Sequence, residues 1–252
     1  MGWKRELLFF IVLVFCTFLP TFASVPFQPQ ETPLIIIEVL KQVDTTYAWL
    51  SPLIHISTLI LIILLYKDGQ KMGRITDIYF GILFLFFALS NNIAVTEQYG
   101  LVVITGNFIM FLAVGIFWIW EVYRPKNEYV FQRLSIWRYW VIPFIILAFW
   151  FPVGADLGPN FDPLLLLTSS FGITFCPTTP LAIAVLTLIY PKVNMVLLKV
   201  TSFVGLIIGL FNLLSLFIMP SYTLWLFTLH TPLILISFYG LVIHKIVSIP
   251  TD

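Results

Sequence analysis

The residues best suited to chemistry in this sequence lie in one run, Gly172-Ile-Thr-Phe-Cys-Pro-Thr-Thr-Pro180, in the middle of a long apolar segment. A proline has no N–H, so each proline leaves a carbonyl three or four residues earlier without its helical partner. We expect this to free the carbonyls of Ile173, Thr174 and Cys176. At membrane depth such groups face protein or water, and in the broken helices of transporters they bind ions or substrate. The run therefore predicts either a small-ligand site or a kink whose threonine hydroxyls cap their own backbone.

We expect the helix to break or kink between Phe175 and Pro180, with Cys176 directed toward other helices. Further polar side chains lie in other apolar segments, where they either line an outward-facing pocket or form hydrogen bonds between helices. The candidate ligand-binding residues are His55, Asn107, Thr174, Cys176, Thr178, Thr179, Asn212 and His230.

A thiolate and two imidazoles would suit a soft metal ion, so Cys176, His55 and His230 are also candidate metal ligands. The alternative is that each histidine is a buried hydrogen-bonding residue. The sequence shows no cofactor motif and supports no catalytic activity, since it has neither a His-Glu-x-x-His pair nor a Gly-x-Ser-x-Gly element. No charged residue lies near the centre of an apolar segment, because Asp77 and Glu121 fall at segment ends.

The elements that must position these residues follow from composition. Of the 252 residues, 60% are hydrophobic and 10% are charged, whereas soluble domains carry about a quarter charged residues. This composition predicts an integral membrane protein and excludes a soluble enzyme. The net charge of +1 excludes nucleic acid as a partner.

The N-terminus resembles a secretory signal peptide. Lys4 and Arg5 precede an apolar run from Leu7 to Leu19, and Pro20-Thr-Phe-Ala23 follows. The run has about 13 residues, short of the roughly 20 that cross a bilayer. Residues 1–23 are therefore predicted to be a cleavable signal peptide or, alternatively, an uncleaved first helix. Residues 24–46 are predicted to be an external segment.

Seven apolar segments follow within residues 47–246, and they predict an all-α polytopic transmembrane bundle of seven spans, or eight with an uncleaved leader. The fourth is short, and the fifth is long and carries the prolines. The segments are 47–66, 75–95, 99–120, 139–151, 163–190, 200–219 and 222–244.

Basic residues predict the orientation, because cytoplasmic loops retain Lys and Arg. With the mature N-terminus outside, ten of the eleven basic residues beyond the leader fall inside, and Lys41 falls outside. The ten are Lys67, Lys71, Arg74, Arg124, Lys126, Arg133, Arg138, Lys192, Lys199 and Lys245. The opposite loops hold Glu97, Asp156 and Asp162 without a base. We therefore expect a multi-pass cell-membrane protein with a cytoplasmic C-terminus.

The region from Leu157 to Gly240 resembles a family of multi-pass prokaryotic membrane proteins classed as a domain of unknown function. The likeness rests on a Gly-x-Thr-x-Cys-Pro-Thr-Thr element, here Gly172–Thr179, followed by an apolar helix and two further spans. The chain departs from that family in its signal peptide and in lacking a Trp-rich sixth span. The resemblance implies a compact helical bundle and assigns no activity.

Two functions follow as expectations. The first is binding or passage of a small neutral or soft ligand through an outward-facing polar pocket lined by the fifth segment. The alternative is a non-catalytic subunit or assembly partner of a membrane complex, in which the polar residues serve helix packing. The expected partners are the lipid bilayer and either another membrane protein or a second copy of the chain.

Overall fold

The computed structural model describes residues 3–131, 136–154, 157–218 and 223–247. Helices make up 74% of these described residues. Arg133, Asp156, Met219 and Tyr222, which enter the predictions above, lie outside the described residues. The elements in chain order are α1 (Trp3–Cys16), β1 (Phe22–Ala23), η1 (Pro29–Glu31), α2 (Thr32–Tyr47), η2 (Ala48–Leu50), α3 (Ser51–Lys67), α4 (Gly69–Ser90), β2 (Ile93–Thr96), β3 (Gly100–Val103), α5 (Thr105–Tyr123), η3 (Ile136–Trp140), α6 (Val141–Trp150), α7 (Leu165–Thr168), α8 (Phe175–Leu188), α9 (Met195–Ile218) and α10 (Leu224–Ile246).

Five helical stretches of the described chain are long and apolar enough to cross a membrane, namely Pro29–Lys67, Gly69–Ser90, Thr105–Tyr123, Met195–Ile218 and Leu224–Ile246. Three shorter apolar helices accompany them, Leu7–Cys16, Ile136–Trp150 and Phe175–Leu188. The prediction of a helical bundle with several apolar helices is confirmed. Each of the seven predicted segments overlaps one of these helical stretches, and the fourth and fifth segments overlap the short helices Ile136–Trp150 and Phe175–Leu188.

The all-α prediction misses a small antiparallel sheet of three strands in the order β1-β3-β2. Ala23 and Ala94 both pair with Val102, so β3 is the central strand. The predicted third helical segment began at Tyr99, but residues 100–103 form a strand and the helix starts at Thr105. Gly100 ends the three-residue turn at φ +64°, a left-handed conformation that glycine adopts without strain.

This sheet packs against α2 and forms a second, smaller core beside the main bundle. Ile35 and Val39 of α2 are fully buried against Tyr99 and Val102. Helix α2 runs through η2 into α3, so most of residues 24–46, which are predicted to be an external segment, is helical and continuous with α3.

Helix α8 lies at the centre of the bundle, and twelve of its fourteen residues are buried. Helices α9 and α10 approach each other closely because glycines lie where they meet. A Cβ on Gly240 would come 2.2 Å from Ser202 Oγ, and one on Gly205 would come 2.4 Å from Ser237 Oγ. Small residues of this kind let membrane helices pack backbone to backbone.

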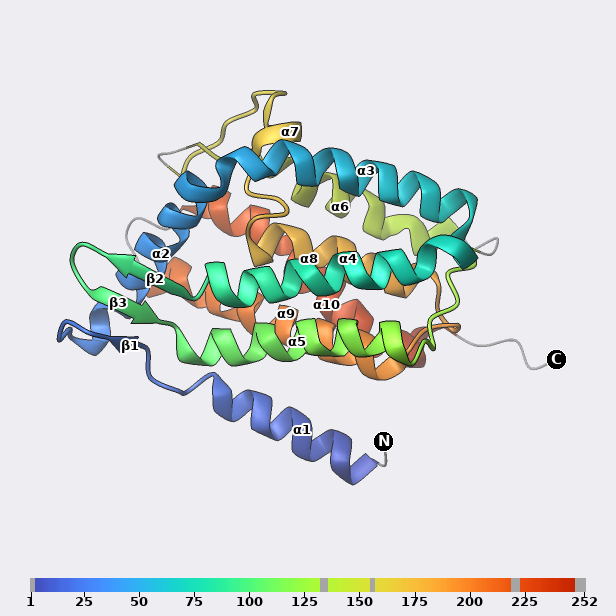
Figure 1. Cartoon of the computed structure of the whole chain (residues 1–252), viewed down its shortest axis with the longest axis horizontal. Helices are drawn as coiled ribbons and strands as arrows, with labels where there is room; N and C mark the ends of the chain where they lie inside the picture. The colour runs from blue at the N-terminus through green and yellow to red at the C-terminus, as the bar shows by residue number, and fades with distance from the viewer. Residues whose placement is uncertain (1–2, 132–135, 155–156, 219–222, 248–252) are drawn as a thin grey trace.

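The two ends of the bundle, at the left and right of Figure 1, differ in the residues that lie there. The sheet lies at one end, which we call the hairpin end. Helices α3, α5, α8 and α10 finish at the opposite end, where α4 and α9 begin. We call this the basic end, because it collects Lys67, Lys71, Arg74, Arg124, Lys126, Arg138, Lys192, Lys199 and Lys245.

Candidate functional site

Residues 169–174, which join α7 to α8, form a non-helical connector inside the protein. Ser169, Phe171 and Ile173 are at most 3% exposed. Buried backbone outside a helix has N–H and C=O groups that need partners. In the connector these partners include side chains that come from α3, α8 and the end of α4.

Asn91, at the end of α4, joins the connector to the start of α8. Its Nδ2 donates to the Ile173 carbonyl at 3.0 Å, and its Oδ1 accepts from the Phe175 N–H at 3.0 Å. In a continuous helix the Ile173 carbonyl would accept from residue 177, which is a proline without an N–H. Asn91 therefore replaces the hydrogen bond that Pro177 cannot make.

His55 of α3 is completely buried and links three segments. Its Nδ1 donates to the Ser51 carbonyl at 2.8 Å, and its Nε2 lies 3.1 Å from Ser169 Oγ. Ser51 Oγ in turn donates to the Ser169 carbonyl at 2.5 Å. The ring also contacts Phe149 edge-on, with centroids 4.7 Å apart. Both ring nitrogens thus have protein partners, which fits the alternative of a buried hydrogen-bonding histidine.

Gly172 makes the turn of the connector possible. Its φ is +79°, and a Cβ there would come 2.1 Å from Ile54 Cγ2. The Gly172 N–H donates to Thr178 Oγ1 at 2.7 Å, and Thr178 Oγ1 donates to the Thr174 carbonyl at 2.7 Å. Thr179 Oγ1 bonds the Phe175 carbonyl in the same way. The threonines of the run therefore cap backbone groups.

The prediction of a break between Phe175 and Pro180 is wrong. The break lies at residues 169–174, and α8 continues without interruption from Phe175 through Pro180 to Leu188. Pro177 is the third residue of α8, where an N–H has no partner inside the helix. The interruption thus precedes the prolines.

The remaining candidates lie on other helices. Cys176 is half-buried, and Asn212 Nδ2 of α9 lies 3.7 Å from its Sγ. The thiol thus faces α9, as predicted. His230 Nδ1 donates to the Leu226 carbonyl of its own helix at 2.7 Å. Asn107 lies in the first turn of α5, one turn before Phe111, whose ring stacks on Phe175.

The structure therefore brings His55, Thr174 and Thr178 to the connector, and it pairs Cys176 with Asn212. The described ranges contain no group of three or more His, Cys, Asp or Glu side chains that could hold a metal ion. The proposed metal set of Cys176, His55 and His230 gains no support from this geometry.

At the basic end, two buried carboxyl groups hold the loops together. Glu121, fully buried, accepts from the backbone N–H groups of Lys126 and Asn127 and from Asn194 Nδ2. Asp77 accepts from Tyr129 Oη at 2.5 Å. Burial, together with the neighbouring Asp77 carboxyl, raises the pKa of Tyr129 well above its usual range.

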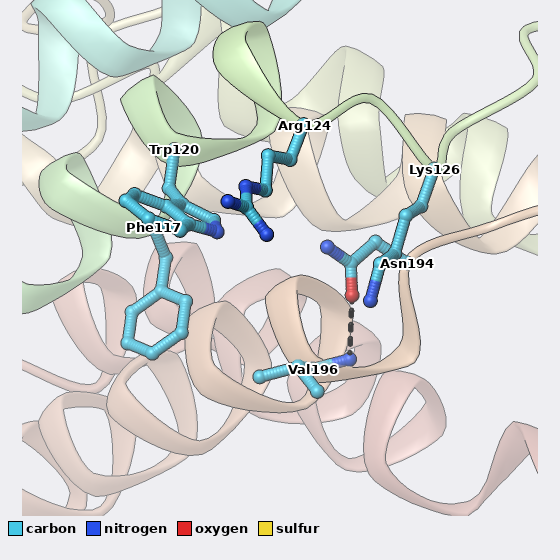
Figure 2. Close-up of a pocket in the computed structure, with 6 residues that line it drawn as sticks. All are labelled: Phe117, Trp120, Arg124, Lys126, Asn194 and Val196. Atoms are coloured by element: carbon cyan, nitrogen blue, oxygen red, sulfur yellow. Dashed lines mark hydrogen bonds between the residues drawn. The ribbon is translucent and has the colours of Figure 1, made fainter. Parts of the chain in front are cut away.

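Next to this cluster lies a pocket of about 230 Å³ between the end of α5 and the start of α9. Figure 2 shows Trp120 and Phe117 on one side and Lys126 and Asn194 on the other, with Arg124 reaching between them. From the sequence, Arg124 and Lys126 served only to predict the membrane orientation. The sequence signal that could have indicated this pocket is an apolar segment whose last residues are rich in aromatic side chains and are followed directly by Arg124-Pro-Lys126.

Comparisons of the chain with protein-family models, with curated proteins and with solved structures find no match. The family resemblance of the Gly172–Thr179 run stays a prediction, and a function has to be inferred from the geometry of the chain itself.

Proposed function

We propose that the chain is a multi-pass cell-membrane protein with seven spans, the mature N-terminus outside and the C-terminus in the cytoplasm. The separation of the bundle into a basic end and a hairpin end supports this orientation, because cytoplasmic loops retain Lys and Arg. The basic end then faces the cytoplasm, and the sheet with α2 lies on the outer side.

The short helix α8 is compatible with a crossing when the connector is counted. Its fourteen residues extend about 21 Å, against a hydrocarbon core of about 30 Å. The connector would then lie within the hydrocarbon depth. Backbone at that depth is tolerated only where protein or water satisfies it, and the bonds from Ser51, Asn91 and Thr178 meet this condition.

We propose that residues 1–23 direct insertion and are removed, and that an uncleaved α1 is the alternative. Cleavage after Ala23 would remove β1, an edge strand, and leave the β2–β3 hairpin intact. In the uncleaved chain α1 packs on α5 and α9 through Phe9 against Phe117 and Phe10 against Phe203. The intact mass of the purified protein distinguishes the two forms.

As its role we propose a non-catalytic subunit or assembly partner in a membrane complex. The observation that carries this proposal is the pairing of the polar groups at the connector: His55, Ser169, Asn91 and Thr178 bond one another or nearby backbone. Polar side chains that are satisfied in this way serve to position helices, whereas a ligand site keeps polar groups available to the ligand.

Ligand binding through an outward-facing pocket is the second proposal, favoured by Cys176. Its side chain is half-buried, rather than fully buried, beside Asn212 where α8 meets α9, and an outward-facing pocket would have to reach it there.

Thiol labelling in intact cells separates the two roles. In a Cys16→Ser variant Cys176 is the remaining thiol. A small membrane-impermeant maleimide should leave Cys176 unmodified in the native protein and modify it fully after denaturation, because a thiol packed among apolar side chains reacts poorly. Modification of native Cys176 from outside would overturn the assembly role in favour of the pocket.

Two control variants without Cys16 and Cys176 make the result interpretable. Asn160→Cys lies on the exposed loop after α6 and should be labelled from outside. Lys71→Cys lies at the basic end and should be labelled only after the cells are opened. The reverse pattern would refute the proposed orientation whatever Cys176 does.

A further inference from the structure

The pocket at the basic end combines two cations with an apolar wall. Arg124 and Lys126 are exposed, and Phe117, Trp120 and Val196 supply the apolar side. The Arg124 guanidinium lies over the Trp120 ring, 5.5 Å from its centroid. A cation–π contact of this kind orients the guanidinium and leaves its N–H groups free to bind an anion.

Neither cation is neutralised by an ion pair in the described part of the chain. The two salt bridges found there join Lys71 to Asp68 and Lys192 to Glu128. Glu121 is a buried acid beside the pocket, but its two oxygens accept from the Lys126 and Asn127 backbone and from Asn194 Nδ2. This carboxylate is thus turned toward the loop, and the pocket keeps a surplus of positive charge.

The pocket is also open toward the side of the bundle. Trp120 is 54% exposed, and Ile116, one turn earlier on α5, is 53% exposed. The apolar outer face of α5 therefore leads directly up to the two cations. A volume of about 230 Å³ is below that of pockets that enclose a whole drug-sized ligand. It suits one charged group whose apolar remainder lies outside.

We propose that this pocket binds the phosphate of an anionic phospholipid from the leaflet at the basic end, with an acyl chain along α5. Basic pockets between membrane helices on the cytoplasmic side bind anionic headgroups, and tryptophan favours the same interfacial depth. The proposal rests on the membrane orientation proposed above, and it is independent of the role assigned to the connector.

The test is a titration of the full-length protein, purified in neutral detergent, with phosphatidylglycerol or phosphatidylcholine, followed by thermal unfolding. Wild-type protein should bind phosphatidylglycerol more tightly. Each cation near an anionic surface contributes about a five-fold effect, so Arg124→Gln with Lys126→Gln should weaken phosphatidylglycerol binding about 30-fold. Binding of phosphatidylcholine should not change.

The matched control is Lys67→Gln with Lys245→Gln, which removes the same charge from the same end and should change the affinity less than about two-fold. An equal loss in the control, or equal affinity of the wild type for the two lipids, overturns the proposal.

Inorganic phosphate is the second probe. If it stabilises the protein as strongly as the lipid does, the pocket is a soluble-anion site and the lipid proposal fails. Unfolding temperatures in phosphatidylcholine alone confirm that the variants are folded.

Discussion

Replacement of Asn91 by leucine should be among the most damaging single changes in the bundle. The amide bridges two backbone groups at the start of α8, the Ile173 carbonyl and the Phe175 N–H, each at 3.0 Å. Leucine has a similar branched shape, is larger and has no polar atom. The variant therefore removes both hydrogen bonds without opening a large cavity.

Each of the two backbone groups would be left buried without its partner, at about 1–3 kcal/mol per group. The expected loss in unfolding free energy is therefore roughly 2–6 kcal/mol. Hydrogen bonds between side chains of membrane helices average only about 0.6 kcal/mol, since the unfolded chain in the bilayer finds other partners. The Asn91 value should exceed this, because Pro177 denies the Ile173 carbonyl its helical alternative.

The assay is reversible unfolding in mixed micelles with increasing sodium dodecyl sulfate, followed by circular dichroism. Asn107→Leu is the matched control, the same change at a half-buried site in the first turn of α5, and should cost less than about 1 kcal/mol. Labelling of Cys176 should become faster in the Asn91 variant, because the start of α8 is released. Equal stability of the two variants would refute the view that Asn91 holds the connector.

Three further predictions concern single contacts. Gly172→Ala should lower the unfolding free energy by roughly 2–4 kcal/mol, because alanine disfavours the left-handed backbone and its Cβ clashes with Ile54. Adding Ile54→Ala to this variant should restore part of the loss in the same unfolding assay, and the absence of rescue would argue against the close approach. Arg138→Leu should lower the unfolding free energy by about 1.5–3 kcal/mol per hydrogen bond lost, because Arg138 Nη2 donates to the Thr187 and Tyr190 carbonyls at the end of α8. An unchanged unfolding free energy would show that Arg138 does not stabilise this helix end. Burial beside Asp77 raises the pKa of Tyr129 in the folded protein. The protonated phenol therefore contributes fully to the unfolding free energy below about pH 10, and this contribution is lost as the pH rises through the folded-state pKa. Tyr129→Phe should therefore flatten the alkaline branch of unfolding free energy against pH, whereas Tyr123→Phe, at a residue 75% exposed, should leave it unchanged.

Sequence reasoning was strongest where the cause is local. A proline frees a carbonyl wherever it stands, so Ile173 and Thr174 were predicted to expose oxygens, and the structure gives these oxygens Asn91 and Thr178 as partners. Apolar length predicted the helices for the same reason, since each of them satisfies its own backbone. The division of basic residues between the loops likewise predicted which helix ends lie together.

The strands and the connector could not be read in this way. Residues 100–103 continue an apolar run into α5, and their pairing with residues 22–23 and 93–96 depends on segments distant in the chain. A two-residue strand such as β1 has no periodicity of its own.

By itself the sequence determined that the chain forms apolar helices, where prolines weaken them and which loops are basic, because these properties belong to single segments. The tertiary structure decided where the fifth segment breaks, since Asn91 and Ile173 are 82 residues apart and Ser51 and Ser169 are 118 apart. It also decided that Arg124 and Lys126 border a pocket that is lined on another side by Asn194, which directly precedes α9. Contacts of this kind arise only when helices pack, because a side chain distant in sequence supplies the hydrogen bond that the local backbone lacks.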